Sequence, residues 1–265
     1  MKMIIFGSGG FLPTPLPLCT CRFCKESPEK RVGPSIYIPG LELLIDTPEG
    51  IYNNITEYKS PISNVLYSHW HPDHTAGIRL FEFLHYTIRS GKKRPRVFMN
   101  DLLLKSFQER VPSLIYYKNK KFIDITKVKE SKFILNDVKI YFIEMRNDFS
   151  VAYLIETPNK NILICMDHAK DLILENINVK IDLLIMNLGF VDVKKGEHVR
   201  SEKTDETNFI EDNLRIIQHL KPSKTVLMHI EPLYNLNKRD LQEIERKYAR
   251  YNLAFAYDGM VLFSE

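Results

Sequence analysis

The stretch Ser68–Gly77 (SHWHPDHTAG) is the most informative part of this chain of 265 residues, because it directly follows a short apolar run. Three of the chain's eight histidines and one aspartate fall within six positions. Imidazole and carboxylate groups are good ligands for zinc and also for manganese or iron. His69 and His71 are two apart and can share one ion, whereas Asp73 and His74 are placed for a second. A solvated loop that contains histidine by chance is the alternative, and this density of ligands disfavours it.

Other residues suited to chemistry also follow apolar, strand-like runs. Because the carboxyl ends of neighbouring strands meet at one edge of a sheet, we expect these residues to lie beside the histidine loop. They are Asp46 after 42–45, Asp167 after 161–166, and His229 after 224–228. His168 stands beside Asp167 and is a candidate only for contact with substrate.

Local signals predict the elements around this site. Ser35–Ile38 and Glu42–Ile45 flank Pro39-Gly40 and predict a hairpin. A helix is expected over Thr75–Leu84 with Thr75 as its cap. A final hairpin is expected from 254–257 and 260–263, about Asp258-Gly259. The polar segment 191–207 is expected to be a long loop that covers a site.

Composition indicates an ordinary globular protein, with 44% hydrophobic and 26% charged residues. We find no apolar run near the ~20 residues that span a membrane, and no domain boundary within 1–265. Met1–Phe6 ends at Gly7 and predicts a first strand, so we expect a cytoplasmic protein. The net charge of +4 suits a small anionic substrate and does not favour nucleic acid as a partner.

The cysteines indicate a second metal site. Cys19, Cys21 and Cys24 fall within six residues, in a proline-containing insertion near 11–34. In a reducing compartment this clustering favours zinc over a disulfide. Cys165 is expected to be a buried strand residue.

The order of these landmarks resembles the metallo-β-lactamase superfamily. His69-Trp70-His71-Pro72-Asp73-His74 matches the His-x-His-x-Asp-His signature of that superfamily. The resemblance implies a single domain of α/β class, an αββα four-layer sandwich. Within the superfamily, Gly7-Ser8-Gly9-Gly10, the cysteine cluster and Tyr257-Asp258-Gly259-Met260 resemble the carbon–phosphorus lyase accessory phosphodiesterases. Those proteins hydrolyse cyclic phosphodiesters of ribose.

The resemblance also implies roles for single residues. His69 and His71 would bind a first ion, and Asp73, His74 and His229 a second. Asp167 would bridge the two ions, and Asp46 would orient the histidine loop. The implied activity is that of a metal-dependent hydrolase, a phosphodiesterase that attacks phosphorus with a metal-activated hydroxide, in which Asp73 is catalytic as a ligand. Zinc is the expected cofactor, with manganese or iron possible, at one or two catalytic ions plus a structural zinc at the cysteines.

Two departures from the family pattern concern the catalytic site. Arg146 stands where the family has a third histidine on the first ion, and a guanidinium does not ligate. Asn147 or Asp148 are candidate oxygen ligands, and we expect the second ion to be the better occupied. Thr207 stands where the related phosphodiesterases carry a catalytic histidine, which leaves His198 as the nearest general acid.

The cysteine site also departs from the family pattern. Pro232 replaces the histidine that serves there as the fourth ligand, which leaves Glu231 as one candidate. Two further functions stay open: a nuclease like the tRNA 3′-end processing members, and a degenerate member that binds metal and a ligand without turnover. Pyrroloquinoline-quinone biosynthesis B proteins share the cysteine cluster and support the second. A homodimer is compatible with the sequence.

Overall fold

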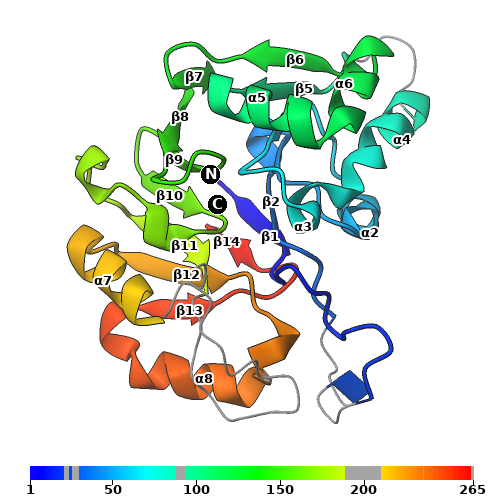
Figure 1. Cartoon of the computed structure of the whole chain (residues 1–265). Helices are drawn as coiled ribbons and strands as arrows, with labels where there is room; N and C mark the ends of the chain where they lie inside the picture. The colour runs from blue at the N-terminus through cyan, green and yellow to red at the C-terminus, as the bar shows by residue number, and fades with distance from the viewer. Residues whose placement is uncertain (21–23, 26–29, 88–92, 189–209, 235, 264–265) are drawn as a thin grey trace.

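A computed structural model describes residues 1–20, 24–25, 30–87, 93–188, 210–234 and 236–263 (Figure 1). Two seven-stranded sheets organise this part of the chain. The first has the strand order β14-β1-β2-β3-β4-β5-β6, and the second has the order β13-β12-β11-β10-β9-β8-β7. Each sheet mixes parallel and antiparallel pairs, which is the α/β arrangement that the sequence predicts.

The first sheet carries the histidine loop. Its strands β1 to β4 are buried on both faces, as expected for short apolar runs covered on both sides. β2 and β3 form the expected hairpin, and β3 to β6 run parallel. The strands are β1 (Met3–Gly7), β2 (Ser35–Ile38), β3 (Leu43–Ile45), β4 (Asn64–Leu66), β5 (Arg96–Met99), β6 (Asp124–Lys127) and β14 (Val261–Leu262).

The second sheet is antiparallel from β7 to β10 and parallel from β10 to β13. β8 alternates buried and more exposed residues, whereas β11 is buried throughout. The strands are β7 (Lys132–Leu135), β8 (Val138–Glu144), β9 (Val151–Glu156), β10 (Asn161–Cys165), β11 (Leu183–Asn187), β12 (Lys224–Met228) and β13 (Leu253–Phe255).

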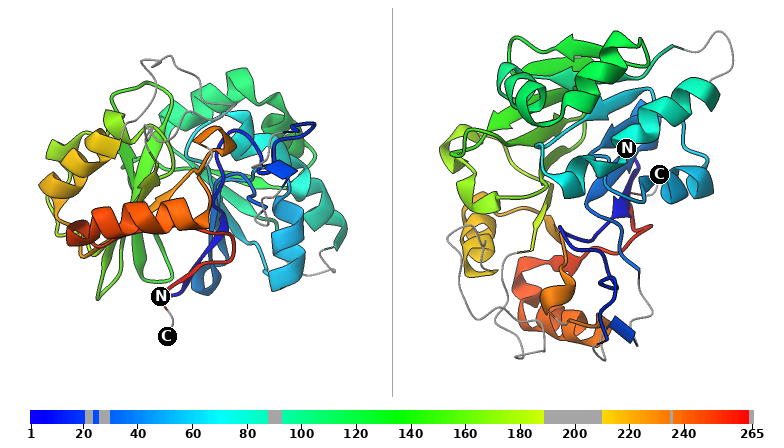
Figure 2. Two further views of the ribbon diagram at one scale, coloured as in Figure 1. Left: turned by 90° about the horizontal axis from the view of Figure 1, so that it is seen from below. Right: turned by 45° about the vertical axis from the view of Figure 1, so that its right-hand side comes forward.

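Helices cover the outer face of each sheet (Figures 1 and 2). Those of the first sheet are α2 (Ile51–Tyr58), α3 (Pro72–Thr75), α4 (Leu80–Thr87), α5 (Asp101–Arg110) and α6 (Pro112–Asn119). Those of the second are α7 (Ile210–Leu220) and α8 (Lys238–Lys247). Short 3-10 helices occupy Pro39–Leu41, Ala76–Arg79, Ala169–Asp171, Leu174–Asn176, Pro232–Tyr234 and Ala249–Tyr251.

Two apolar clusters hold these layers together. The larger contains side chains from both sheets, such as Phe6 and Tyr153, together with Phe107 of α5. The smaller lies between the second sheet and its helices, where Ile217 of α7 and Leu241 of α8 are buried. The predicted αββα four-layer sandwich is therefore confirmed. That the chain is one domain with an insertion near 11–34 stays a prediction.

The helix expected over Thr75–Leu84 is wrong in detail. It begins earlier, at Pro72, whose ring fixes the backbone in the helical range at the first position. The segment then continues as α3, a 3-10 turn and α4. Thr75 is inside this segment, and its hydroxyl donates to the carbonyls of Trp70 and His71 instead of capping a helix.

The predicted C-terminal hairpin is also wrong. β13 pairs with β12 in the second sheet, whereas β14 pairs with β1 in the first. Asp258 accepts hydrogen bonds from Ser8 and Val32, and the amide of Gly259 donates to Ile5. These contacts hold the turn between the two sheets, so the segment connects them instead of folding back on itself.

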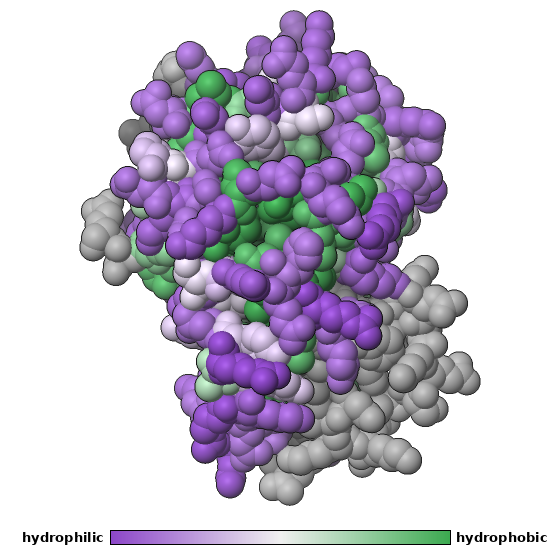
Figure 3. All heavy atoms as spheres, turned by 90° about the vertical axis from the view of Figure 1, so that its left-hand side faces the viewer, coloured by the Kyte–Doolittle hydropathy of each residue, from purple (hydrophilic) through white to green (hydrophobic). Residues whose placement is uncertain are grey.

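The surface on the side that carries β8 to β10 is mainly hydrophilic, with apolar side chains gathered across its middle (Figure 3). None of the helices in the described ranges combines the length and the hydropathy that a membrane span requires.

Candidate metal centre

The candidate site is built where four strands end. Asp46 follows β3, and the histidine loop follows β4. Asp167 and His168 follow β10, and His229 follows β12. Because β3 and β4 run parallel, as do β10, β11 and β12, these ends meet at one edge of the two facing sheets. The predicted convergence of distant segments is what the structure shows.

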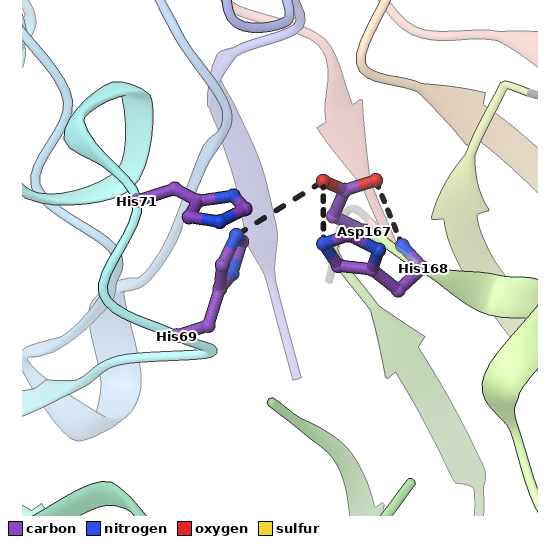
Figure 4. Close-up of side chains that lie close together, drawn as sticks. All are labelled: His69, His71, Asp167 and His168. Atoms are coloured by element: carbon purple, nitrogen blue, oxygen red, sulfur yellow. Dashed lines mark hydrogen bonds and ion pairs between the residues drawn. The ribbon is translucent and has the colours of Figure 1, made fainter. Parts of the chain in front are cut away.

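A first group of ligands combines both sheets. His69, His71, Asp167 and His168 each offer one donor atom, and these four atoms lie within 4.8 Å of one another. Nε2 of His69 is 4.0 Å from Oδ2 of Asp167, and Nε2 of His168 is 3.4 Å from the same oxygen. Figure 4 shows the imidazoles of His69 and His71, from the side of the first sheet, pointing towards Asp167 and His168, from the side of the second sheet.

A second group lies beside the first. It contains Asp73, His74 and His229, whose donor atoms also lie within 4.8 Å of one another. Oδ2 of Asp73 is 3.3 Å from Nε2 of His74 and 3.3 Å from Nε2 of His229. Oδ2 of Asp167 is 3.8 Å from Nε2 of His229. The carboxylate of Asp167 thus lies between the two groups.

Several ring nitrogens of these groups have no hydrogen-bond partner. Within the described residues, Nε2 is buried and unpartnered in His69, His74, His168 and His229. Burying a polar atom without a partner is unfavourable, and such atoms call for an explanation. Four nitrogens that face nearby carboxylate oxygens match the donor set of divalent cations. The residues present therefore fit bound metal ions.

Asp46 orients this loop from behind. Its Oδ2 lies 2.7 Å from Nδ1 of His74 and accepts a hydrogen bond from the hydroxyl of Ser68. Its Oδ1 accepts the amide of Ser68. Both Asp46 and His74 are fully buried. Since the carboxylate of Asp46 holds Nδ1 of His74, the opposite nitrogen of this ring faces Asp73.

In the metal-free chain the pKa values of the side chains differ between the two ligand groups. Burial lowers the pKa of His69 well below its ordinary value, and the neighbouring imidazoles lower it further. Burial also lowers the pKa of His71. In His74 the carboxylates of Asp73 and Asp46 outweigh the effect of burial and raise the pKa to about 10. Although burial opposes its ionisation, the imidazoles around Asp167, chiefly that of His229, hold the pKa of this carboxyl below its usual range.

The position of the expected third histidine lies outside both ligand groups. Arg146 occupies it, and the candidate oxygen ligands beside it are Asn147 and Asp148. Arg146 is exposed, and its backbone amide donates to the carbonyl of Asp171. The side chain of Asn147 is engaged: it donates to Asp171 and accepts from the amide and hydroxyl of Ser150. Asp148 is exposed in the wall of a neighbouring cavity.

Some predicted residues lie outside the described part of the chain. These are His198, Thr207 and Cys21, so the general acid and the complete cysteine cluster stay predictions. Cys19 is half-buried and Cys24 is buried. Cys165 is buried in β10, as expected.

Glu231 has a different setting from the one expected of a zinc ligand. It is buried, and its carboxylate accepts the backbone amides of Phe11 and Leu12. It also lies 3.4 Å from Nδ1 of His229. The carboxylate therefore supports the second group from behind, a position comparable to that of Asp46.

His168 is the residue that sequence reasoning left without a metal role. It directly follows Asp167 and has a left-handed backbone, with φ of +56°. The signal in the sequence is only that a histidine stands next to a strand-end aspartate. Nothing in the sequence shows in which direction its ring points.

A cavity of about 690 Å³ lies against the first group. His71 and His168 form part of its wall, together with the rings of Trp70 and Phe149. Both cationic and anionic side chains line the remainder: Lys105, Arg110, Lys170, Glu109, Asp148 and Asp171. The guanidinium of Arg110 lies 4.5 Å from the centre of the Trp70 ring.

The sequence model of the metallo-beta-lactamase superfamily matches residues 59–201, more than half of the chain. The chain belongs to the metallo-beta-lactamase superfamily. Divalent metal binding follows from this fold family together with the two ligand groups. Among curated proteins, no sequence matches the chain.

Several solved structures share the fold of this chain at low sequence identity. A diphosphatase from the PhnP family superposes with a TM-score of 0.77 at 19% identity, over 98% of this chain and 96% of its own. Zinc-bound PqqB from Methylobacterium extorquens gives 0.69 at 17% identity, over the whole of both chains. The short form of human tRNase Z gives 0.66 at 15% identity, over 99% of each chain.

Proposed function

We propose that this protein is a metal-dependent hydrolase that acts on a small phosphodiester. The observation that carries the proposal is the set of buried, unpartnered imidazole nitrogens around the carboxylates of Asp73 and Asp167. These residues come from both sheets, so the site is preorganised by the fold.

The proposed ligands fall into the two groups described above. His69, His71 and Asp167 hold a first ion, and Asp73, His74 and His229 hold a second, with Asp167 between them. Zinc is the proposed ion, with manganese or iron as alternatives. Divalent ions at such a site activate water and offset the negative charge of a phosphate.

The residues of the chain supply orientation around these ligands. Asp46 and Glu231 hold the outer nitrogens of His74 and His229, so that each inner nitrogen faces Asp73. Although burial opposes its ionisation, the imidazoles of His74 and His229 hold the pKa of Asp73 below its usual range in the metal-free chain. The carboxylate of Asp73 is a proposed metal ligand, which is the catalytic role that we assign to it. His198 remains the proposed proton donor to the leaving group.

The cavity next to the first group supports a small substrate. Its volume of about 690 Å³ is within the range of small-molecule pockets. Lys105, Arg110 and Lys170 offer positive charge to a phosphate beside an equal number of carboxylates, and Trp70 and Phe149 offer flat apolar surfaces. These features suit an anionic molecule with a planar or apolar part better than a long nucleic acid.

Hydrolysis assays with defined metals test the proposal. The protein loaded with zinc, manganese or iron is given bis-p-nitrophenyl phosphate, a cyclic nucleotide phosphodiester and a nucleoside diphosphate ester. The diphosphate ester is included because a PhnP-family member of the same fold is described as a diphosphatase. We expect turnover of a phosphodiester, abolished in His69→Ala and retained in His219→Ala, whose exposed imidazole lies on α7.

The outcome also separates the other readings. Cleavage of a tRNA precursor with no turnover of small diesters would favour a nuclease like tRNase Z. No hydrolysis with any of the three metals would favour a member of the superfamily that binds metal and a ligand without turnover.

A structural zinc at Cys19, Cys21 and Cys24 is a separate part of the proposal, since three thiolates in six residues suit zinc. Metal analysis of the triple serine variant tests it. We expect this variant to contain one zinc less per chain than the parent protein.

A further inference from the structure

His168 lies in the first ligand group with the features of a metal ligand. Its side chain is 11% exposed, and its Nε2 is among the buried nitrogens without a hydrogen-bond partner in the described part of the chain. That nitrogen is within 4.8 Å of the donor atoms of His69, His71 and Asp167. The position is therefore not that of a solvated loop histidine.

The local backbone directs the ring into the site. His168 has φ of +56° and ψ of +33°, a conformation that residues with a Cβ adopt rarely. Two contacts hold it: its amide donates to Oδ1 of Asp167 at 2.7 Å, and the amide of Ala169 donates to Asn187. The hydrogen bond from the amide of His168 occupies Oδ1 of Asp167, so Oδ2 of this carboxylate faces the imidazoles of His168 and His69.

The neighbouring aromatic rings enclose the imidazole without bonding to its nitrogens. The ring of Phe149 meets it edge to face at 5.1 Å between centres. The rings of His69 and His71 lie at 5.4 and 5.7 Å, also edge to face. Phe149 therefore limits solvent at the ring while leaving Nε2 directed at Asp167.

We propose that His168 is the third imidazole ligand of the first metal ion, the place for which Arg146 is unsuited. With His168, the group contains three imidazoles and one carboxylate, which is the number of donors that zinc takes. The first ion is then held as completely as the second, contrary to the weak first position expected from the sequence. This inference rests on the metal binding in the proposed function and not on turnover.

Metal counting tests this assignment without any substrate. The variants are made in the background in which Cys19, Cys21 and Cys24 are serine, so that only catalytic ions are counted. His168→Asn is the main variant, because asparagine tolerates a left-handed backbone. His168→Gly is the second variant, and Arg146→Ala is the matched control from the neighbouring loop.

After equilibration in buffered zinc, the parent and Arg146→Ala are expected to retain two ions per chain. His168→Asn and His168→Gly are expected to retain one, with at least a tenfold loss of affinity for the other. Thermal unfolding of the metal-free proteins should be alike in parent and His168→Asn. Cobalt substitution should show the loss of one of the two visible absorption components.

Retention of both ions at parental affinity in the two His168 variants would overturn the proposal, and so would loss of an ion in Arg146→Ala. If both ions stay and only the KM for a diester rises, His168 contacts substrate and is not a ligand. Loss of one ion in a protein that hydrolyses none of the substrates supports the ligand assignment and counts against the hydrolase alone. A parent that binds no ion would overturn both.

Discussion

Oδ2 of Asp46 and Nδ1 of His74 lie 2.7 Å apart, and both side chains are fully inaccessible to solvent. The contact fixes the ring of His74 with Nε2 facing the second ligand group. The ring is therefore positioned before any ion binds, and it is positioned by a residue from the end of a different strand.

Asp46→Asn is expected to weaken the second metal position. The amide keeps the size of the side chain and tolerates the left-handed backbone at residue 46, but it removes the charge that supports His74. We expect zinc affinity for one of the two ions to fall by roughly 10- to 100-fold. Competition with a chromophoric chelator measures this change.

Asp182→Asn is the matched control for that variant. Asp182 accepts the backbone amide of Asn161 at the far end of β10, so it has a similar structural bond away from the site. Unchanged affinity in Asp46→Asn, or an equal loss in Asp182→Asn, would show that Asp46 does not act through His74.

Metal binding is expected to release protons from the second group. In the metal-free chain the carboxylates around His74 raise its pKa to about 10, and Asp167 raises the pKa of His229 well above its ordinary value. His74 therefore carries the additional proton of an imidazolium at pH 7, which zinc must displace, and the raised pKa of His229 acts in the same direction. The affinity for zinc should fall as the pH is lowered, and zinc binding at pH 7 should release protons.

Calorimetry in two buffers with different ionisation enthalpies measures this proton release. The triple cysteine-to-serine background removes the contribution of the thiols. Asp46→Asn should release fewer protons, because it loses a charge that favours protonated His74. A buffer-independent binding enthalpy in the parent would contradict the assigned charges.

Much of the site could be predicted from the histidine loop and from strand ends. The loop identifies its candidate ligands directly, and Asp167 and His229 each follow an apolar run that forms a buried strand. His168 could not be assigned in this way, because the direction of its ring depends on the left-handed backbone and on the hydrogen bond to Asp167.

The C-terminal segment shows a second limit of the sequence pattern. Asp258-Gly259 between two apolar runs is typical of a hairpin, and a hairpin needs only local pairing. The chain instead pairs each run with a distant strand, because Asp258 accepts from Ser8 and Val32. These partners lie more than 220 residues away in the sequence, beyond the reach of local rules.

Tyr153→Phe is expected to destabilise the contact between the two sheets. The hydroxyl of Tyr153 in β9 donates to the carbonyl of Tyr67 at 2.6 Å, next to the start of the histidine loop. Both residues are fully buried, so the variant leaves a carbonyl without its partner. We expect a loss of about 1–3 kcal/mol in the free energy of unfolding, measured by urea denaturation of the metal-free protein.

Tyr141→Phe provides the comparison for Tyr153. The hydroxyl of Tyr141 donates to Glu156 at 3.0 Å in a partly exposed position. Removal of this hydroxyl should lower the free energy of unfolding by less than about 0.5 kcal/mol, since water can replace its hydrogen bond to Glu156. Equal effects of the two variants would show that the bond from Tyr153 adds nothing specific between the sheets.

Gly10→Ala is expected to disturb the second ligand group, because Gly10 lies against Glu231 and His229 in the segment that follows β1. A Cβ at residue 10 would overlap the carboxylate of Glu231 and would lie 2.6 Å from Nδ1 of His229. Since Glu231 also holds the amides of Phe11 and Leu12, the carboxylate has little freedom to move away. We expect a loss of about 1–3 kcal/mol in stability together with weaker zinc binding.

Gly40→Ala is the control for the added methyl group, because a Cβ there would meet no atom within 4 Å. We expect it to leave zinc binding unchanged, with stability equal to or slightly above that of the parent. Thermal unfolding and chelator competition on both variants compare the two sites. Parental zinc affinity in Gly10→Ala would mean that Glu231 moves aside without displacing His229, and that its contact does not position the imidazole.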